Sequence, residues 1–343
     1  MNVTVASGVV GLANMPVDTT TTGSALRAQP LLRITDLRHS FDGRAVLSGL
    51  NLTVGRGELF ALLGPNGCGK STTLRVLAGL LVPNGGALEF MGKSVAPGGR
   101  PLRERMGVVF QSGSLDGRLT ARENLMLTCA LYGLRGMEAS KRVEEVLAIS
   151  GLQERANDAV QDYSGGMRRR LELARALMHE PDLLLMDEPT TGLDETAFRS
   201  TWERILKLRQ QRGLTVLFTT HRAEEAQLCD RVAIMDGGRV IAEGQPEALR
   251  SQVSGDVLSL DVEQPEAFVA EVAQKFSVAP RVVHGQVVIE HERGHDLIPR
   301  LVEAFPGGRI KSLSMHRPTL ADVFVKLTGR VLGDEGASKE DHD

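Results

Sequence analysis

A buried strand that runs into a glycine-rich loop and then into a helix constrains this chain more than any other feature. Glu58–Leu63 is typical of a buried strand, Gly64–Ser71 matches G-x-x-x-x-G-K-[ST], and Ser71–Leu80 has the character of a helix. The glycines let backbone N–H groups turn inward around phosphate oxygens, where a Cβ would crowd the anion. The start of the following helix adds a partial positive charge. The segment therefore predicts a nucleotide phosphate site.

A second apolar strand, Leu183–Met186, ends in the acidic pair Asp187 and Glu188. In such a site Lys70 places a point charge between the β- and γ-phosphates, and the Ser71 hydroxyl can bind Mg²⁺. Asp187 can reach the Mg²⁺ shell opposite Ser71. Glu188 is placed to orient or deprotonate the attacking water. Together the loop and the acidic pair predict hydrolysis of ATP with Mg²⁺ as cofactor.

A second turn of the same kind, Ser164-Gly165-Gly166, precedes a helix that starts near Met167. A hydroxyl and bare glycines at a helix N-terminus can bind an anion. For this segment alone, an ordinary N-cap is the simpler interpretation. The Arg168–Arg170 run that follows is typical of a solvated helix face rather than of a nucleic-acid patch. Two phosphate-binding turns in one domain suggest that nucleotide is held by two copies of the protein.

Three further side chains lie where such a site would need them. His221 directly follows the strand ending in Thr220, and Gln111 follows Gly107–Phe110; both lie at edges where open α/β sheets bind ligands. Gln111 can reach the metal or the water there, and Phe41 can stack on a base. Taken singly, the histidine and the phenylalanine are equally typical of structural positions.

Composition bounds the class of protein. Apolar and charged fractions of 42% and 24% are those of a soluble globular protein. A net charge of -3 and an aromatic content of 4% argue against a nucleic-acid partner. No apolar run approaches the roughly 18 residues that span a bilayer, so a pore would have to be another chain. Three scattered cysteines fit a reducing compartment. One of them, Cys68, lies inside the phosphate loop, and we expect its alkylation to block ATP binding.

Changes in composition and in the pattern of strands and helices along the chain predict two domains and two tails. Residues 1–30 and 331–343 are expected to be disordered tails. Residues 31–247 alternate strands and helices, which predicts a mostly parallel sheet, with a helical subdomain at about 112–178. Residues 256–330 follow the order β-α-β-β-α-β, which suits a small ferredoxin-like domain.

The order and spacing of these motifs resemble those of ABC-transporter ATPase subunits over residues 31 to about 247. The motifs that carry the resemblance are Gly64–Ser71, Gln111, Ser164-Gly165-Gly166, Asp187-Glu188, Thr191-Gly192-Leu193-Asp194 and His221. The fold that this implies is an α/β P-loop NTPase domain with a helical subdomain, followed here by the small α+β domain.

The resemblance also implies a role for each site residue. Glu188 would be the catalytic base, His221 would contact the γ-phosphate, and Gln111 would bind the metal and couple the site to the membrane subunit. Mg²⁺ would be held by Ser71, Asp187 and Gln111. Ser164 to Met167 would close on ATP bound by the opposite subunit of a head-to-tail homodimer. The expected nucleotide-binding residues are Phe41, which faces adenine, Gly64, Pro65, Asn66, Gly67, Cys68, Gly69, Lys70, Ser71, Thr72, Ser164, Gly165, Gly166, Met167 and, at the dimer interface, Asp194.

Two residues differ from the common family pattern and indicate which kind of transporter the ATPase serves. Tyr163 and Met167 replace the common Leu and Gln on either side of Ser-Gly-Gly, and Tyr-Ser-Gly-Gly-Met is similar to the version in daunorubicin-resistance-type exporters. Pro318–Phe324 also resembles the ending of that group. We therefore expect the ATPase of a drug, antibiotic or lipid-like exporter, peripheral to the cytoplasmic face of the inner membrane and bound to a separate permease. The alternatives are a transporter for ions, polysaccharide or haem, a soluble ABC ATPase acting on ribosomes or DNA, and a regulatory binding module.

Overall fold

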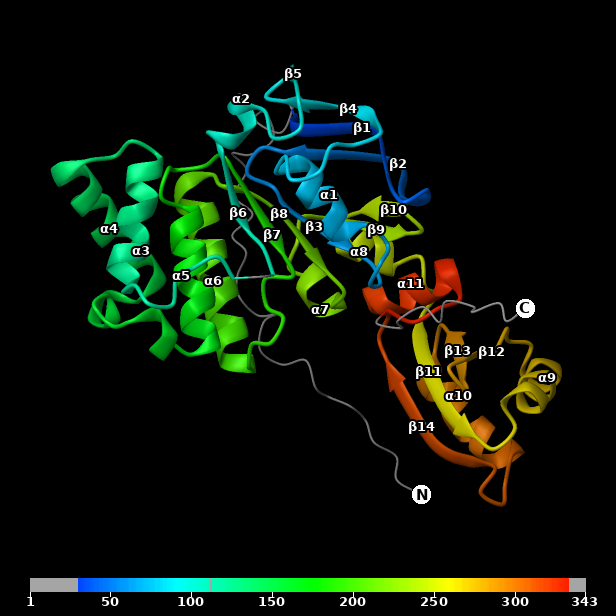
Figure 1. Ribbon diagram of the computed structural model, residues 1–343. Coiled ribbons are helices and arrows are strands. Elements are labelled where there is room, and N and C mark those ends of the chain that lie inside the picture. The colour runs from blue at the N-terminus through cyan, green and yellow to red at the C-terminus, as the bar shows by residue number, and fades with distance from the viewer. Residues whose placement is uncertain (1–29, 112, 333–343) are drawn as a thin grey trace. The chain divides into compact units, whose positions relative to one another are not determined.

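The computed structural model describes residues 30–111 and 113–332, and these form two compact units (Figure 1). The first, the cassette unit, runs to His221 and includes Leu228–Ala242. The second, the C-terminal unit, comprises Arg222–Gln227 and the residues from Glu243 onward. Nearly all of the two segments expected to be disordered, 1–30 and 331–343, lies outside the described residues.

A six-stranded sheet forms the centre of the cassette unit. Its order is β10 (Arg239–Gly244), β9 (Arg231–Asp236), β3 (Leu59–Leu63), β8 (Thr215–Thr220), β7 (Leu183–Asp187) and β6 (Met106–Val109). Strands β9, β3, β8, β7 and β6 pair in parallel, so their carboxyl ends share one edge. All five residues of β3 and of β7 are buried, which explains their uninterrupted apolar sequences.

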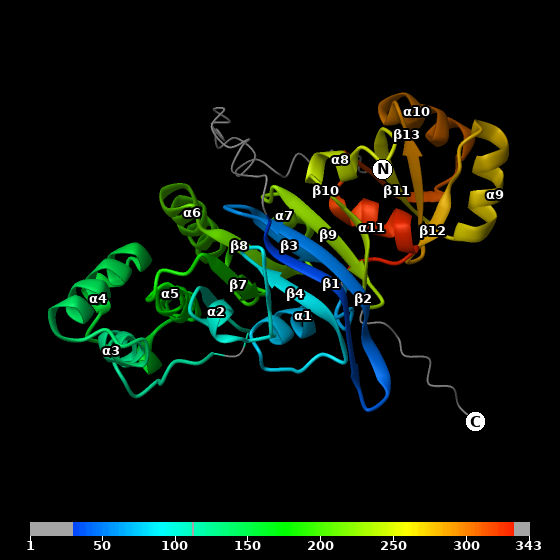
Figure 2. The ribbon, with the colours of Figure 1, turned by 90° about the horizontal axis from the view of Figure 1, so that it is seen from above.

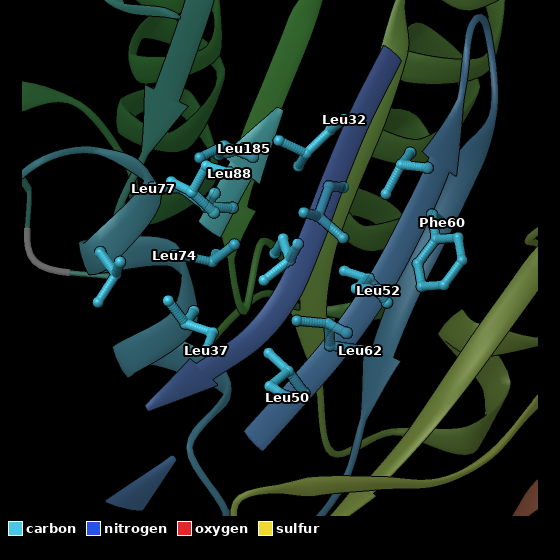
Figure 3. Close-up of a cluster of buried hydrophobic side chains, with 14 of the residues drawn as sticks. Leu32, Leu37, Leu50, Leu52, Phe60, Leu62, Leu74, Leu77, Leu88 and Leu185 are labelled. Carbon is cyan, nitrogen blue, oxygen red and sulfur yellow. The ribbon is translucent and has the colours of Figure 1, made fainter. Parts of the chain in front are cut away.

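An antiparallel sheet of four strands supplies the other half of the main core. Its order is β2 (Arg44–Gly55), β1 (Pro30–Phe41), β4 (Gly85–Phe90) and β5 (Lys93–Val95). Helix α1 (Lys70–Leu77) contributes Leu74 and Leu77 to a cluster that also contains Leu37, Leu50 and Leu62 (Figure 3). This packing holds α1 directly behind the glycine loop, where its N-terminus faces the phosphate site.

Three helices with a core of their own form the helical subdomain, gathered at one end of the cassette unit (Figure 2). They are α3 (Ala121–Leu131), α4 (Gly136–Ser150) and α5 (Gly165–Ala176), and the short 3₁₀ turns Gln153–Arg155 and Val160–Asp162 lie between α4 and α5. Helix α5 begins two residues before Met167, where the sequence predicts its start. Side chains cap two of the three helices, because Thr120 caps α3 and Ser164 caps α5. The remaining helices of this unit are α2 (Arg100–Arg103) and α6 (Glu195–Arg212).

The C-terminal unit has the strand order of a ferredoxin-like fold. Its elements are β11 (Asp256–Val262), α9 (Pro265–Phe276), β12 (Arg281–Val283), β13 (Gln286–His291), α10 (Gly294–Ala304) and β14 (Ile310–His316), with the sheet in the order β12-β13-β11-β14. Apolar side chains of α9 and α10 cover one face of this sheet. The unit also contains α7 (Ala223–Ala226), α8 (Pro246–Arg250) and α11 (Leu320–Thr328).

The Pro318–Phe324 segment builds the start of α11. Thr319 and Asp322 form a capping box, and His316 Nε2 lies 3.1 Å from Asp322 Oδ2. The hydrogen bond with Asp322 raises the pKa of His316 above its ordinary value. Leu320, Val323 and Phe324 are buried, so the polar and apolar residues of the segment each have a local structural role.

Candidate active site

The glycine loop connects β3 to α1 at the shared carboxyl edge of the parallel strands. A Cβ at Gly64 would lie 2.5 Å from the carbonyl oxygen of Met235 and 2.7 Å from Cys68 Sγ. Gly67 and Gly69 have φ of +76° and +104°, values that side chains strongly disfavour. The path of the loop therefore requires glycine at these three positions. Between them, Pro65 is buried and Asn66 is exposed.

Lys70 is the first residue of α1 and its ammonium group spans the loop. The side chain is 4% exposed, and Nζ donates hydrogen bonds to the carbonyl oxygens of Gly64 (2.8 Å) and Pro65 (2.9 Å). Its distance to Glu188 Oε1 is 3.9 Å. Because an anionic oxygen is a stronger acceptor than a carbonyl, this ammonium group is suited to bind a phosphate that enters the loop.

Asp187, at the end of β7, is the buried carboxylate of the site. Its Oδ1 accepts hydrogen bonds from the hydroxyls of Ser71 (2.8 Å) and Thr219 (2.6 Å), and the residue is only 2% exposed. Proteins usually hold Mg²⁺ through one or two carboxylates together with substrate phosphates. The hydroxyl of Ser71 and the carboxylate of Asp187 fit the protein's share of such a set.

Glu188 directly follows β7 and is held in a strained conformation, with φ of +45°. Its backbone N–H donates to Thr219 Oγ1 (3.0 Å). Its carboxylate receives a hydrogen bond from Thr191 Oγ1 (3.0 Å) and lies 3.2 Å from His221 Nδ1. Both oxygens of this carboxylate are thus held in place, next to the lysine of the phosphate loop. The carboxylate is placed to act as a general base.

A cleft of about 500 Å³ brings together three of the expected site residues. Gln111, Gly165 and Glu188 line it, together with Thr191 and Gly192 from the loop that leads into α6. Residues as far apart in sequence as Gln111 and Gly192 thus meet beside the candidate base. Phe41 ends β1 and is 41% exposed, with His39 edge-on at 4.5 Å, so it is not a core residue. Thr72 lies in the first turn of α1 and is partly buried.

Ser164 caps α5 in the ordinary way, since its side chain accepts a hydrogen bond from Met167 N at 3.2 Å. Gly165 is different. A Cβ there would meet no atom within 4 Å, and its φ is not positive. Nothing among the described residues therefore requires glycine at this exposed position. Gly166 has a structural reason, because its Cβ would lie 3.1 Å from that of Ala197. Asp194 is an exposed N-cap of α6, bonded to Ala197 N at 2.8 Å.

The expectation that Arg168–Arg170 form a solvated face is wrong for Arg169. Its side chain is 12% exposed and is bonded to backbone carbonyls at the ends of β6 and β7. Sequence reasoning also missed Thr219, which bonds both acidic residues. The signal that identifies Thr219 is the parallel register, in which Asp187 pairs with Thr219, and a sequence pattern does not contain that register.

The structure also revises the expected reactivity of Cys68. The thiol is 4% exposed, and burial raises its pKa above the usual value. Since the thiolate is the reactive form, we expect N-ethylmaleimide at neutral pH to leave nucleotide binding largely intact. The rate of labelling should rise as the pH is raised toward the thiol pKa.

Mass spectrometry after timed labelling, compared between Cys68→Ser and the parent, measures this rate. Cys129 and Cys229 are also buried, so all three should label quickly after unfolding. Rapid loss of ATP binding at neutral pH, prevented by Cys68→Ser, would contradict the expectation.

The domain has a parallel sheet, with the glycine loop and the acidic pair at the end of β7 both at its carboxyl edge. These features define a P-loop nucleotide-hydrolysing domain. Residues 47–191 match the family model described as ABC transporter. The chain belongs to the ABC transporter family as an ATP-binding subunit, and it is an ATPase of that family.

Curated relatives resemble the chain over nearly their whole length. The Nod factor export ATP-binding protein I of Paraburkholderia xenovorans (strain LB400) is 40% identical over 306 residues, covering 87% of this chain and 97% of the relative. The protein of the same name from Ralstonia nicotianae is 38% identical over 324 residues, covering 91% and 98%.

Solved structures resemble a large part of the chain. The protein cbiO1 from Clostridium perfringens, part of the ABC transporter complex cbiONQ, gives a TM-score of 0.61 at 28% identity and covers 72% of this chain and 96% of its own. The ATP-binding cassette MJ0796, solved as a dimer in a post-hydrolysis state with ADP and Pi, gives 0.57 at 28% identity, covering 62% and 98%.

Proposed function

We propose that this chain hydrolyses ATP to power export of a drug, antibiotic or lipid-like compound through a separate permease. The observation that carries the proposal is the whole-length similarity to relatives named as export ATP-binding proteins. In the described part of the chain, no helix is both long and apolar enough to cross a membrane. The proposed location is the cytoplasmic face of the inner membrane, with the ATPase subunit attached peripherally.

The proposed working form is a head-to-tail homodimer. Gly165 supports it, because an exposed glycine without a steric reason in its own subunit leaves room for a ligand to approach the backbone. In this arrangement Ser164–Met167 contact the ATP held by Lys70 and Ser71 of the other copy, with Asp194 at the interface. Phe41 faces adenine and His221 contacts the γ-phosphate.

The chemistry follows from the groups around Glu188. Mg²⁺, when bound with ATP, would supply charge neutralisation at the phosphates; Ser71 and Asp187 would hold it, with Gln111 reaching it from the cleft. Glu188 takes the proton of the attacking water, and Thr191 and His221 hold its carboxylate in place. Residues 31–247 would form the ATPase domain, 112–178 its helical subdomain and 256–330 an accessory domain.

Affinity purification from membranes solubilised in detergent tests the proposal. A multi-span hydrophobic protein should copurify with the tagged chain, and inverted vesicles containing both should accumulate cargo only when ATP is supplied. In vesicles containing Glu188→Gln the complex should remain and the uptake should cease. Recovery with ribosomes, or stimulation of the ATPase by DNA, would instead support the soluble alternative. Uptake of a metal ion, a polysaccharide or haem would show that the cargo belongs to another substrate class.

A further inference from the structure

Arg169, in the second turn of α5, occupies a junction of three backbone segments. Its contacts are Nε to Pro189 O (2.8 Å), Nη1 to Phe110 O (2.6 Å), Nη1 to Glu172 Oε2 (3.0 Å), Nη2 to Asp187 O (3.1 Å) and Nη2 to Glu188 O (3.3 Å). One guanidinium group therefore bonds four carbonyl oxygens and a carboxylate. It also lines the cleft that contains Gln111, Gly165 and Glu188.

The bonded carbonyls belong to the segments that carry the chemistry. Phe110 immediately precedes Gln111, and the other three carbonyls are those of Asp187, Glu188 and Pro189. The carboxylate partner, Glu172, extends the junction, because its Oε1 accepts a hydrogen bond from Ser114 N at 3.3 Å. The two segments that carry Gln111 and Glu188, both of which line the cleft, are thus bonded to one side chain of α5.

The chemistry of arginine suits this position. Its planar guanidinium presents five N–H donors in a fixed fork, so several acceptors can be held at set distances from one another. Arg169 and Glu172 are 12% and 9% exposed, and each compensates the other's buried charge. A residue such as Glu188, with a positive φ, keeps its conformation only where its surroundings over-determine it. Arg169 supplies part of that constraint through the carbonyls on both sides of the strained residue.

We propose that Arg169 is a positioning residue that couples the start of α5 to the catalytic geometry of Glu188 and Gln111. The N-terminus of α5 carries Ser164–Gly166, and Arg169 lies four residues beyond Gly165, a rise of about 6 Å along the helix. A displacement of this helix end therefore moves the guanidinium group, and with it the backbone of Glu188. The inference rests on the role of Glu188 under the proposed function. It adds that Arg169 on α5 positions this residue.

Removal of the guanidinium group tests the inference in the full-length protein. Arg169→Ala should lower kcat for ATP hydrolysis on the order of 10²-fold, the effect of a misplacement of about 1 Å at a reacting centre. The KM for ATP should stay within threefold, because Lys70 and the glycine loop are untouched. Guanidinium ion at low millimolar concentration should restore part of kcat in Arg169→Ala, and should have no effect on Arg169→Met, whose side chain fills the space.

Two further variants separate positioning from folding. Arg204→Met is the matched control, because Arg204 also donates to a backbone carbonyl, that of Ile149 at 2.7 Å, away from the cleft; its kcat should be unchanged. Arg169→Lys keeps the charge beside Glu172 but has a single ammonium group, so it should fold, bind ATP and still lose kcat.

The opposite results would overturn the inference. Normal kcat in folded Arg169→Lys, a loss that raises KM as much as it lowers kcat, or guanidinium rescue of Arg169→Met as well would each show a merely structural arginine. The separate variant Glu188→Gln distinguishes the two levels of proposal. If Glu188→Gln hydrolyses ATP normally, the assignment of the base fails. If Glu188→Gln is inactive and the Arg169 variants are not, only the positioning role fails.

Discussion

Glu188→Gln should lower kcat for ATP hydrolysis by about 10²- to 10⁴-fold, the usual contribution of a general base, while ATP still binds. The amide is nearly the same shape as the carboxylate and can still accept a hydrogen bond from Thr191, so the backbone and the cleft should keep their form. What disappears is the proton acceptor. The substitution also removes a negative charge 3.9 Å from the ammonium group of Lys70, so bound ATP should be retained and the ATP-bound dimer should accumulate.

Steady-state turnover, nucleotide binding and size-exclusion chromatography with ATP and Mg²⁺ measure these three effects. Glu203→Gln is a suitable control, since Glu203 is an exposed residue of α6 and the same change of charge there should alter none of them. Turnover equal to that of the parent would remove Glu188 from the mechanism.

Gly165→Asp should abolish ATP hydrolysis by the dimer and leave ATP binding to the isolated subunit unchanged. The space around Gly165 accommodates a side chain without a clash, so the fold should tolerate the change. Under the proposed arrangement the new carboxylate faces the γ-phosphate held by the other copy, and a like-charge contact of this kind costs several kcal/mol. The loss should therefore exceed about 10²-fold. Gly165→Ala, which adds only a Cβ, should bind ATP and remain partly active.

A mixture of Gly165→Asp with Lys70→Ala provides the sharper result. In a head-to-tail dimer of these two inactive variants, one site combines the intact glycine loop of the first with the intact α5 terminus of the second. The other site carries both defects. Activity should therefore return in mixed dimers isolated through two different tags. If isolated mixed dimers stay inactive, each site is built within one chain, and the composite arrangement is wrong.

The glycine loop and its conformation could be predicted from sequence because the constraints on its residues are local. Gly64, Lys70 and Ser71 follow one another within eight residues, and the constraint on each is a property of the turn itself. The strand that ends in Asp187 could be recognised for the same reason, since burial on both faces leaves an unbroken apolar run.

The contacts that hold the acidic residues in place could not be predicted, because they depend on which residues of distant segments lie beside one another. Thr219 reaches Asp187 only through the parallel pairing of β7 with β8. Arg169 belongs to a run of three arginines that look alike in sequence, and the packing of α5 selects the one that points toward β6 and β7. Likewise, burial of Cys68 inside the loop follows from the core beneath it rather than from its motif.

The full burial of β3 has a further consequence for how the cassette unit moves. Its amides lie between β8 and β9, so they should exchange with solvent only when the whole unit unfolds, whereas helices with a small core of their own can open or shift at lower free energy. We therefore expect the glycine loop to keep a rigid anchor in β3, and any movement during nucleotide binding and release to occur in the helical subdomain, which has a separate core. The contacts of the glycine loop with phosphate should then stay constant, while the position of the N-terminus of α5 changes.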